Sequence, residues 1–450
     1  MNPPVLETPV SPSKNFPGMV NGKHSVLKKD DLCIAHILRK YDPAEWGGTE
    51  TAIHRLCTGM HAIDVESVIF CPQIENISTS DPLAEAGCTV RRFQAFLPVL
   101  GISASARQQQ VAVGGNLMSL ELLPVLMNAP DISIIHTHAL GRLGGVAAFV
   151  ARARQVPLVV TIHGGFLDLP DALKENFRKA RRGWEWGKIF GLLLRSRSLL
   201  QRADAILTCN PREAALLREK YPGQRIIVQP HGISMELYRQ DRRQQALDAF
   251  PLIRGRKMLL CVGRIDAVKN QRWLVEQAPA IFRRHPEALL VLAGACTDKD
   301  YGAALNARIK ELGLENRVLL TGGLPPGDAR LIGLFQEACV VLLPSVSETF
   351  GLVILEAWAA GTVVIASRTS GASALIREGQ NGWLFDHGDS SAFHAAVDAA
   401  LLKPETATHF AHEGGKLVNA EYDNAALVQR MKNLYKQLIE EKHALRHIAR

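Results

Sequence analysis

The stretch ACVVLLP-SVSETFG-LVILEAWAAG, residues 338–361, joins a short apolar run, a polar turn and a second apolar run. The first run, 338–344, is rich in β-branched residues and predicts a buried parallel strand. The second run predicts a helix from Leu352 to Ala360 that ends at Gly361. A turn from a parallel strand into a helix lies at the carboxyl edge of a doubly wound sheet, where unpaired N–H groups at the helix start can hold a phosphate. We therefore expect a ligand site at this turn.

Two acidic residues flank the turn. Glu348 stands before the predicted helix, and Glu356 stands within it. Carboxylates beside an anion site are poorly suited to bind the phosphate itself, but they accept hydrogen bonds from hydroxyl groups. A ligand with many hydroxyls beside a diphosphate is a nucleotide sugar, so the pattern indicates a site for that class of ligand.

Glu348 and Glu356, with Phe350 and Gly351 between them, resemble the E-x7-E signature of the retaining glycosyltransferases of the group 1 family. The resemblance implies the GT-B fold, an α/β architecture in which two Rossmann-like, doubly wound parallel-sheet domains face each other across a cleft. It implies a hexosyltransferase that moves a sugar from a UDP- or GDP-sugar to an acceptor hydroxyl, in the synthesis of a cell-surface polysaccharide or glycolipid. In this family retention is usually ascribed to front-face attack, with the departing phosphate accepting the acceptor's proton.

The chain has 450 residues, of which 47% are apolar, and this is enough for two hydrophobic cores. No apolar run approaches the ~18 residues of a membrane span. The N-terminal stretch MNPPVLETPVSPSKN lacks the basic-then-apolar pattern of a signal peptide. We therefore expect a cytoplasmic protein. The eight cysteines are scattered and form no C-x-x-C pair, which predicts reduced core residues and neither a disulfide framework nor a zinc site.

The net charge of +8 is concentrated in one segment. Residues 171–202 hold nine basic residues and three acidic ones, a distribution that argues against diffuse nucleic-acid binding. One face of a predicted helix in this segment carries the apolar residues Trp186, Ile189, Phe190 and Leu193. Two interpretations stay open: contact with an anionic membrane surface or an acidic acceptor, or a helix that packs on the sheet with a solvated basic face.

Two series of apolar, β-branched runs alternate with helical patterns, which is typical of parallel α/β sheets. The first series is LCIAHIL, ESVIFC, CTVRRF, DISIIHTH, VPLVVTIH, DAILTC and RIIVQP, and the second is KMLLCVGR, ALLVLAG, NRVLLTG, ACVVLLP, TVVIAS and GWLF. The predicted parts are a flexible leader (1–30), an N-terminal acceptor-side domain (31–235), a linker (236–256), a C-terminal nucleotide-sugar-binding domain (257–423) and a terminal helix (424–450). The resemblance implies that this last helix crosses back to the N-terminal domain.

Gly47 and Gly48 follow the first predicted strand and open a helix, where a backbone without Cβ atoms can approach a ligand closely. An ordinary tight turn is the alternative, but in the family that the chain resembles this loop lies against the donor's diphosphate. Arg264 and Lys269, in VGRIDAVKN, resemble the family's G-R-x4-K pattern, which implies that they neutralise the leaving diphosphate. Preorganised cations there lower the barrier as negative charge builds on the departing oxygen. Asn270 follows where many relatives have glycine.

Three histidine-containing motifs end predicted strands. His163 precedes two glycines in a pattern that resembles the family's T-x-H-G, which implies that its imidazole faces the donor sugar; a structural role is the alternative. His136 and His138 alternate along IIHTH, so we expect their rings on opposite faces of the sheet and no shared metal. His231 and Gly232 stand where relatives usually have Asn-Gly, and the sequence does not define their role.

The residues for which we predict catalytic roles are Arg264, Lys269, Glu348 and His163. The residues that we expect to bind the donor are Gly47, Gly48, Gly294, Gly322, Gly323, Thr349, Phe350, Gly351, Leu352 and Glu356. Glu356 is expected to hold the ribose hydroxyls and Glu348 those of the sugar, while backbone N–H groups near Phe350 and Gly351 complete the phosphate site. No metal or other cofactor is expected, because Arg264 and Lys269 supply the positive charge.

The expected partners are a nucleotide-sugar donor and an acceptor glycan, glycolipid or small molecule, with no nucleic acid. One alternative keeps the fold but uses a sugar phosphate, as in a phosphorylase-like or synthase-like enzyme. A second alternative is a nucleotide-sugar-binding protein without catalysis. A nicotinamide-dependent dehydrogenase is disfavoured, because no G-x-G-x-x-G follows the first strand of either half.

Overall fold

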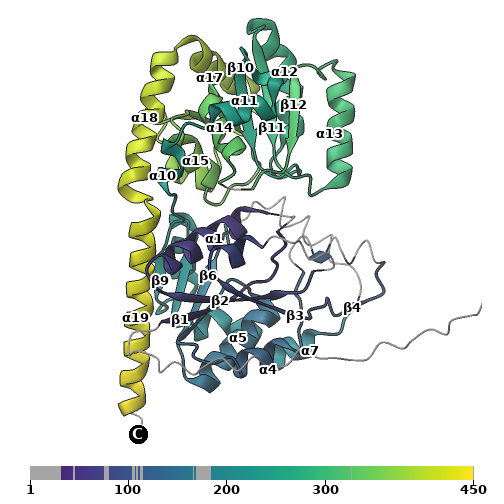
Figure 1. Cartoon of the computed structure of the whole chain (residues 1–450). Coiled ribbons are helices and arrows are strands. Elements are labelled where there is room, and N and C mark those ends of the chain that lie inside the picture. The colour runs from purple at the N-terminus through teal and green to yellow at the C-terminus, as the bar shows by residue number, and fades with distance from the viewer. Residues whose placement is uncertain are drawn as a thin grey trace, which may run out of the picture. The chain divides into compact units, whose positions relative to one another are not determined.

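The computed structural model describes residues 32–43, 46–74, 81–103, 107, 110–111, 115–165, 167–168, 184–325 and 327–448 (Figure 1). The predicted leader, 1–30, and the part of the basic segment from 171 to 183 lie outside the described residues. Residues 32–450 form one compact unit. The statements below refer to the described part of this unit.

The first sheet, in the described residues, has seven parallel strands in the order β3-β2-β1-β5-β6-β8-β9. Their bounds are β1 Cys33–Ile37, β2 Glu66–Pro72, β3 Thr89–Phe93, β5 Ile134–Thr137, β6 Leu158–Ile162, β8 Ala205–Thr208 and β9 Ile226–Val228. All seven runs of the first predicted series are strands. The short antiparallel pair of β4, Val99–Leu100, and β7, Trp184–Glu185, was not predicted.

The second sheet has six described strands, also parallel, in the order β12-β11-β10-β13-β14-β15. Their bounds are β10 Lys257–Val262, β11 Ala288–Ala293, β12 Val318–Gly322, β13 Val340–Leu343, β14 Val364–Ser367 and β15 Trp383–Phe385. The prediction of two doubly wound parallel sheets is confirmed.

Helices follow most strands and cover both faces of each sheet (Figure 1). The described helices up to the end of β9 are α1 Gly48–His61, α2 Pro82–Glu85, α4 Leu122–Met127, α5 Gly141–Arg154, α7 Lys188–Leu193, the 3-10 turn η1 Ser196–Ser198, α8 Leu199–Arg202 and α9 Pro211–Lys220. Those after β9 are α10 Met235–Arg239, α11 Arg243–Ala249, the 3-10 turn η2 Pro251–Ile253, α12 Gln271–Arg284, α13 Lys299–Glu311, α14 Ala329–Glu337, α15 Leu352–Ala359, α16 Ser370–Leu375, α17 Ser390–Leu402, α18 Pro404–Glu421 and α19 Asn424–Ile448.

Alternate residues of β1 enter different hydrophobic cores, because successive side chains of a strand point to opposite faces. Ala35 and Ile37 pack in a cluster that includes Leu143 of α5, whereas Ile34 packs in a cluster that includes Tyr435 of α19. A strand buried on both faces reads as a continuous apolar run, which is why these strands were recognisable in the sequence.

The connections reverse direction at one point in each sheet. In the first sheet the chain moves outward from β1 to β3 and resumes on the other side at β5; in the second sheet the corresponding neighbours are β10 and β13. Ligands of open α/β sheets bind outside the carboxyl ends of the strands at such a point. The loops after β1, β5, β10 and β13 are therefore where the fold itself predicts a site.

The segment predicted as a linker, 236–256, carries the end of α10, all of α11 and the turn η2. It packs on α14: the backbone N–H of Arg242 donates to Gln336 Oε1 at 2.7 Å, and Ala246 is buried. A Cβ on Gly333 would lie 2.1 Å from Arg242 O, so glycine is what allows this close approach.

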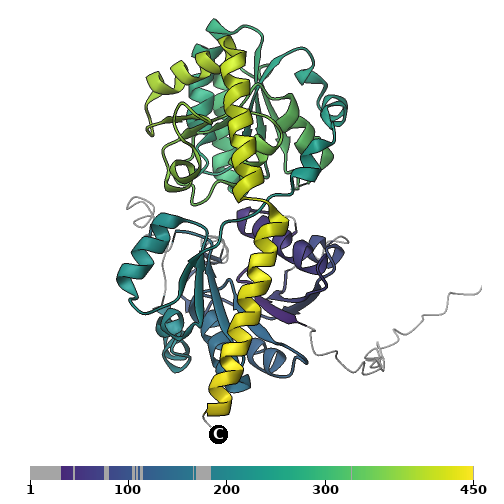
Figure 2. The same ribbon diagram turned by 90° about the vertical axis from the view of Figure 1, so that its left-hand side faces the viewer.

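The last two helices run beside both sheets (Figures 1 and 2). α18 packs on α15 and α17, and α19 packs on α1. The buried face of α19 is formed by Leu427, Val428, Met431, Tyr435 and Leu438. Among the described helices, none combines the length and the apolar character that crossing a bilayer requires.

All eight cysteines are free thiols. Six are buried, Cys339 is half-buried and Cys296 is exposed. The prediction of core positions holds for the six buried cysteines.

Candidate active site

A cavity of about 400 Å³ lies where loops from the two sheets meet. Of the fourteen residues that we predicted from the sequence, all but Gly322 line it. Those lining residues are Gly47, Gly48, His163, Arg264, Lys269, Gly294, Gly323, Glu348, Thr349, Phe350, Gly351, Leu352 and Glu356. Gly322, with φ +74° at the end of β12, has an open surrounding in which a Cβ would meet nothing within 4 Å. The structure therefore brings thirteen of the predicted residues to one place.

The loop after β10 carries two cations into this cavity. Lys269 Nζ lies 2.5 Å from Glu348 Oε2, in the loop after the neighbouring strand β13. Arg264 Nη2 lies 3.0 Å from Asp266 Oδ2, and the Arg264 side chain is 46% exposed. Asp266 Oδ1 accepts from the backbone N–H groups of Val268 and Lys269 at 3.0 Å each, so the loop is held in one conformation. Asp266 was not predicted as a site residue.

Asn270 starts α12 with φ +59°. This left-handed conformation is common for glycine and tolerated by asparagine. A glycine could adopt the conformation that Asn270 has here, and Asn270 Nδ2 also donates to Pro344 O at 3.2 Å.

The turn after β13 has the geometry of an anion site. Gly351 precedes α15 with φ +93°, and no side chain of the described residues caps this helix start. The first N–H groups of a helix have no partner inside the helix, and its dipole is positive there. Gly371 packs directly against this turn. Its N–H donates to Glu348 O at 2.8 Å, and a Cβ on Gly371 would lie 2.6 Å from Phe350 N.

The Gly47-Gly48 loop approaches the second sheet from the first. α1 begins at Gly48, and the carboxylate of Glu50 in its first turn accepts from the backbone N–H groups of Gly47 and Glu50. A Cβ on Gly47 would lie 4.0 Å from Arg264 Cδ, and a Cβ on Gly48 would lie 3.9 Å from Leu352 Cδ1. The start of α1 and the uncapped start of α15 thus meet at the cavity beside Arg264.

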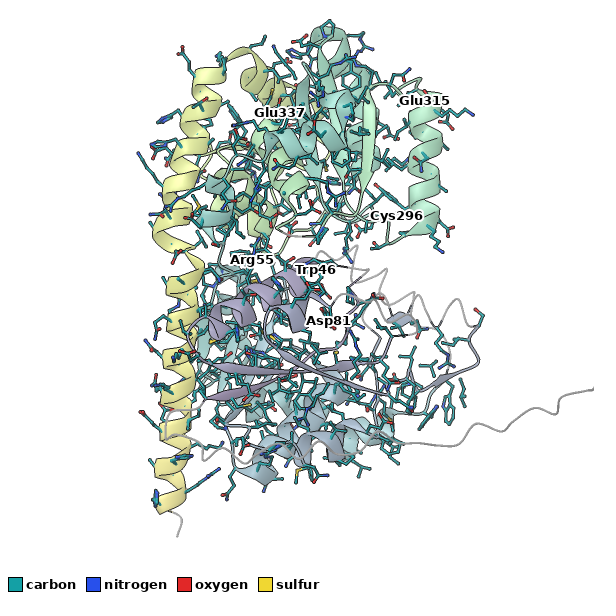
Figure 3. The ribbon with its side chains drawn as sticks, viewed as in Figure 1. Trp46, Arg55, Asp81, Cys296, Glu315 and Glu337 are labelled. Atoms are coloured by element: carbon teal, nitrogen blue, oxygen red, sulfur yellow. The ribbon has the colours of Figure 1, made fainter. Side chains whose placement is uncertain are left out.

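Glu356 is buried in α15 and paired with a residue that the sequence did not indicate. Arg55 Nη2 of α1 lies 2.5 Å from Glu356 Oε1, and Arg55 Nη1 donates to Gly232 O at 3.2 Å. Burial raises the pKa of Glu356, and the Arg55 guanidinium opposes this rise. Arg55 lies two turns after Gly48 on the same helix, and its side chain is 14% exposed (Figure 3 labels Arg55).

Thr349 connects the two halves. Asn210 Nδ2, after β8, donates to Thr349 O at 2.8 Å, and Thr349 Oγ1 donates to His163 O at 3.3 Å. Gly164 has φ +119°, and a Cβ there would lie 2.3 Å from Thr349 Cβ. Gly164, the glycine of the T-x-H-G pattern, is therefore required for contact between the halves, and Asn210 is a further residue that sequence reasoning missed.

Trp46 also lines the cavity without having been predicted. Its Nε1 donates to Thr51 Oγ1 at 2.8 Å, and Thr51 Oγ1 donates to Gly47 O at 2.9 Å. These bonds hold the glycine loop against α1 (Figure 3 labels Trp46).

His163 is half-buried, and burial lowers its pKa from 6.5 to about 4, so its imidazole is neutral at pH 7. Its Nε2 lies 2.8 Å from His138 Nδ1. The His231 ring stacks on the His163 ring at 5.5 Å and contacts Phe350 edge-on at 5.0 Å. The histidine that departs from the family's Asn-Gly pattern thus lies between two predicted site residues.

The expectation that His136 and His138 point to opposite faces of the sheet is wrong. Their ring centroids lie 4.1 Å apart. The physical reason is that successive side chains of a strand alternate between faces, so His136 and His138, which are two residues apart, lie on the same face. The His138 N–H donates to Ile37 O just beyond the end of β1.

Close packing explains why residues 294 and 323 are glycines. A Cβ on Gly294 would lie 1.9 Å from Gly263 O, and one on Gly323 would lie 3.0 Å from Ala295 Cβ. These glycines let the strand ends β10, β11 and β12 meet closely beside the cavity.

The described part of the basic segment forms β7, the six-residue helix α7 and the turns after it. Trp186 stacks on Phe96 at 6.0 Å and meets Phe190 edge-on at 6.1 Å. The side chains of Trp184, Ile189, Leu192 and Leu193 are 60–76% exposed, and Leu100 of β4 is 53% exposed. We call these five residues the apolar patch.

Comparison with known proteins agrees with this geometry. Residues 47–232 match the family model described as "Glycosyl transferase 4-like domain", and residues 243–417 match the model described as "Glycosyl transferases group 1". The chain is 32% identical over 276 residues to the D-inositol 3-phosphate glycosyltransferase of Nocardia farcinica, a match over 60% of this chain and 58% of that protein. The matched region thus spans less than two thirds of that relative's length.

Two solved structures share the fold. HepE of Anabaena, solved in complex with UDP and glucose, superposes with a TM-score of 0.68 at 17% identity, over 90% of this chain and 100% of that one. Sucrose-phosphate synthase of Thermosynechococcus elongatus superposes with a TM-score of 0.68 at 23% identity, over 91% of this chain and 100% of that one. With both halves matched by family models and this arrangement of sheets, the chain belongs to the group 1 glycosyltransferases and has the GT-B fold.

Proposed function

We propose that this protein is a retaining, metal-independent glycosyltransferase that moves a sugar from a UDP- or GDP-sugar to an acceptor hydroxyl. One observation carries the proposal: Arg264, Lys269, Glu348 and Glu356, which come from two stretches of the chain, line the same cavity as the start of α1 and the uncapped start of α15. Cations, helix starts and carboxylates in one cavity match a ligand with a diphosphate between two polyhydroxyl groups.

The donor is held mainly by the second half. Its diphosphate lies against Arg264, Lys269 and the N–H groups at the start of α15. Glu356 accepts hydrogen bonds from the ribose hydroxyls: Arg55 engages Oε1, which leaves Oε2 for the ligand. Glu348 accepts from the hydroxyls of the transferred sugar, and His163 lies on the other side of the cavity.

The reaction exchanges one bond at the sugar's anomeric carbon. The bond to the diphosphate oxygen breaks, the bond to the acceptor oxygen forms on the same face, and the acceptor's proton passes to the departing phosphate oxygen. Arg264 and Lys269 stabilise the negative charge that builds on that oxygen, and so do the α15 N–H groups. These groups supply the role that a divalent cation has in other sugar transfers, so no metal is required.

The first test is a thermal-shift panel of UDP- and GDP-sugars, free nucleotides and sugar phosphates on the intact protein. We expect one nucleotide sugar to raise the melting temperature, because a ligand that binds only the folded state stabilises it. That sugar, incubated with candidate acceptors, should give a product detectable by mass spectrometry. The name of the relative makes inositol phosphates the first acceptors to include. Stabilisation by a sugar phosphate alone would favour the phosphorylase-like alternative, and binding without transfer to any acceptor would favour the non-catalytic one.

We further propose that the protein works in the cytoplasm, in peripheral contact with an anionic membrane. The free cysteines support a reducing compartment. The apolar patch lies beside the exposed cations Lys188, Arg195 and Arg197, and apolar residues beside basic ones suit an anionic lipid surface.

Co-sedimentation with vesicles of mixed anionic and zwitterionic lipid tests the membrane contact. Binding should fall in the double variant Leu192→Glu, Leu193→Glu and in high salt. The matched control, Leu402→Glu, changes a leucine of similar exposure that lies on α17. Equal binding of all three proteins contradicts the contact.

A further inference from the structure

Five histidines form a row of neighbouring rings from the core of the first half to the cavity. The centroid distances are 5.3 Å from His36 to His138, 4.1 Å from His136 to His138, 5.0 Å from His138 to His163 and 5.5 Å from His163 to His231. His36 and His136 are buried, and the other three are half-buried. The proposed reaction uses only His163, so the other four rings need an explanation.

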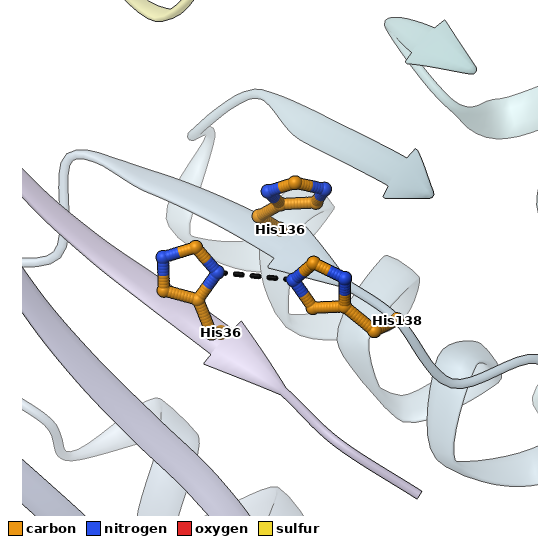
Figure 4. A group of neighbouring side chains, drawn as sticks. All are labelled: His36, His136 and His138. Atoms are coloured by element: carbon orange, nitrogen blue, oxygen red, sulfur yellow. Dashed lines mark hydrogen bonds between the residues drawn. The ribbon is translucent and has the colours of Figure 1, made fainter. Parts of the chain in front are cut away.

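Three of the five form a hydrogen-bonded chain. His36 Nδ1 lies 3.1 Å from His138 Nε2, and His138 Nδ1 lies 2.8 Å from His163 Nε2 (Figure 4 shows the first of these contacts). Both end nitrogens, His36 Nε2 and His163 Nδ1, are buried and have no hydrogen-bond partner among the described residues. The chain thus ends at His163, which lines the proposed donor site.

The imidazoles of this chain are neutral at pH 7. Burial lowers the pKa of His36 to about 3 and that of His163 to about 4, and it also lowers the pKa of His138 well below 6.5. A neutral imidazole carries one proton, so one of its nitrogens donates and the other accepts.

This rule couples the three tautomers. If His163 carries its proton on Nδ1, its Nε2 must accept from His138 Nδ1–H, and His138 Nε2 must in turn accept from His36 Nδ1–H. If His36 carries its proton on Nε2, the same reasoning gives Nε2–H in all three rings. Any mixture places two lone pairs or two protons against each other at about 3 Å, which low polarity makes costly. The chain therefore has two allowed states, with all protons on Nδ1 or all on Nε2.

We propose that His36 and His138 are positioning residues that set the tautomer of His163, and so decide whether Nδ1, its nitrogen outside the chain, is a hydrogen-bond donor or an acceptor. The hydrogen bond made by one ring nitrogen determines the protonation of the other. This proposal rests on the proposed role of His163 at the donor site. His36 does not line the donor site; it acts on His163 through His138.

A metal site is the other arrangement that these side chains suggest, because ligand atoms of His36, His136 and His138 lie within 4.8 Å of one another. Both nitrogens of His136 are already engaged: Nδ1 lies 2.6 Å from Tyr435 Oη and Nε2 lies 2.6 Å from Thr161 Oγ1. A metal bound by all three residues would have to displace one of these short bonds and one of the two bonds that His138 makes to His36 and His163. The hydrogen-bonded chain of His36, His138 and His163 requires no such displacement.

The test is nitrogen NMR of the intact protein labelled with 15N-histidine, which distinguishes Nδ1–H from Nε2–H in each ring. Single His→Gln substitutions assign the signals. We expect His36, His138 and His163 to share one tautomer at pH 7. His36→Gln should shift the nitrogen signals of His163, although the two rings share no contact. Mixed tautomers in the unsubstituted protein, or unchanged His163 signals in the variant, would overturn the proposal.

Tyr435→Phe is the matched control, because it removes a hydrogen bond from the same cluster but leaves the chain intact. It should leave the His163 signals in place. With an active donor, His36→Gln should lower kcat about 10- to 100-fold, as loss of an orienting partner does elsewhere, with little change in the donor KM. If elemental analysis finds tightly bound metal in stoichiometric amount, the proposal of a hydrogen-bonded histidine chain is also overturned. If no nucleotide sugar is turned over, the proposed function fails while the NMR result still decides the histidine chain.

Discussion

Arg55 and Glu356 form an ion pair, with Nη2 lying 2.5 Å from Oε1, although 301 residues separate them. Arg55 belongs to the helix that the glycine loop starts, and Glu356 belongs to the helix after β13. Their side chains are only 14% and 7% exposed. The pair thus joins the two halves at the point where the donor's ribose is proposed to bind.

Removing one partner of this pair should destabilise the protein. Arg55→Ala leaves a buried carboxylate without its cation, which costs about 3 kcal/mol in comparable sites. We expect a lower midpoint of thermal unfolding, measured by circular dichroism. The double variant Arg55→Met, Glu356→Leu should recover much of the loss, because a buried pair replaced by apolar groups leaves no unpaired charge. Equal melting of Arg55→Ala and the unsubstituted protein would mean that the pair does not form in solution.

Glu356 should matter chiefly for nucleotide binding. In Glu356→Gln the amide keeps a carbonyl oxygen but loses the charge, so binding of UDP or GDP should weaken by on the order of tenfold through loss of a charge-assisted hydrogen bond. Isothermal titration measures this directly. Glu413→Gln, on the exposed side of α18, serves as the control. Unchanged nucleotide affinity in Glu356→Gln would remove the ribose role.

Arg264 and Lys269 should matter chiefly for turnover. Replacing either with Ala removes a cation that stabilises the departing phosphate, so kcat should fall by on the order of 10²- to 10³-fold. Arg272→Ala is a matched control, since Arg272 is an exposed arginine on the first turn of α12 that lies outside the cavity. The melting curve of Arg264→Ala should stay close to that of the unsubstituted protein, because Arg264 is 46% exposed. Lys269→Ala should melt lower, because it leaves the mostly buried Glu348 carboxylate without its cation. Near-normal turnover of a folded Lys269→Ala would exclude its leaving-group role.

Metal chelation should leave the reaction unaffected, because the proposed stabilisation of the diphosphate uses protein cations and helix starts. Initial rates with excess EDTA and with added Mg²⁺ should agree within experimental error. A large loss in EDTA that Mg²⁺ restores would show that the site needs a cation beyond Arg264 and Lys269.

Stability should fall with acidification between about pH 6.5 and pH 4. The pKa of His36 is lowered from 6.5 to about 3 and that of His163 to about 4, both by burial. Below pH 6.5 the unfolded chain therefore binds protons that the folded chain does not, and each such histidine lowers the free energy of unfolding by about 1.4 kcal/mol per pH unit. Melting temperatures at pH 7.5, 6.0 and 5.0 measure this trend. His36→Gln should flatten it, and a variant with the same slope as the unsubstituted protein would contradict the assignment to His36.

The sequence was sufficient for most of the fold because buried parallel strands are continuous apolar runs. All thirteen predicted strands are present, and the turn from 344 to 352 connects a strand to a helix as predicted. The β4–β7 pair was missed because each strand has two residues, too few for a period to show. The rings of His136 and His138 were misplaced because residues two apart in a strand share one face, whereas the prediction put them on opposite faces.

Some residues of the candidate site were likewise predictable from the sequence, and others were not. Glycines, cations and acids in loops after strands were found because the loop chemistry and its place beside a strand are both local properties. Arg55, Asn210 and Asp266 were missed because each acts through a partner elsewhere in the fold, or through backbone groups whose orientation only the loop conformation defines.

The amino-acid sequence by itself determined two parallel sheets, the loops at their carboxyl ends and the residues that bring charge to them, since periodicity and motif spacing are properties of consecutive residues. Only the tertiary structure decided which distant groups meet: Arg55 with Glu356, Thr349 with Asn210, and His36 with His163 through His138. The physical reason is that ion pairs and hydrogen bonds depend on distances of about 3 Å, and packing of whole sheets and helices sets those distances for residues that are far apart along the chain.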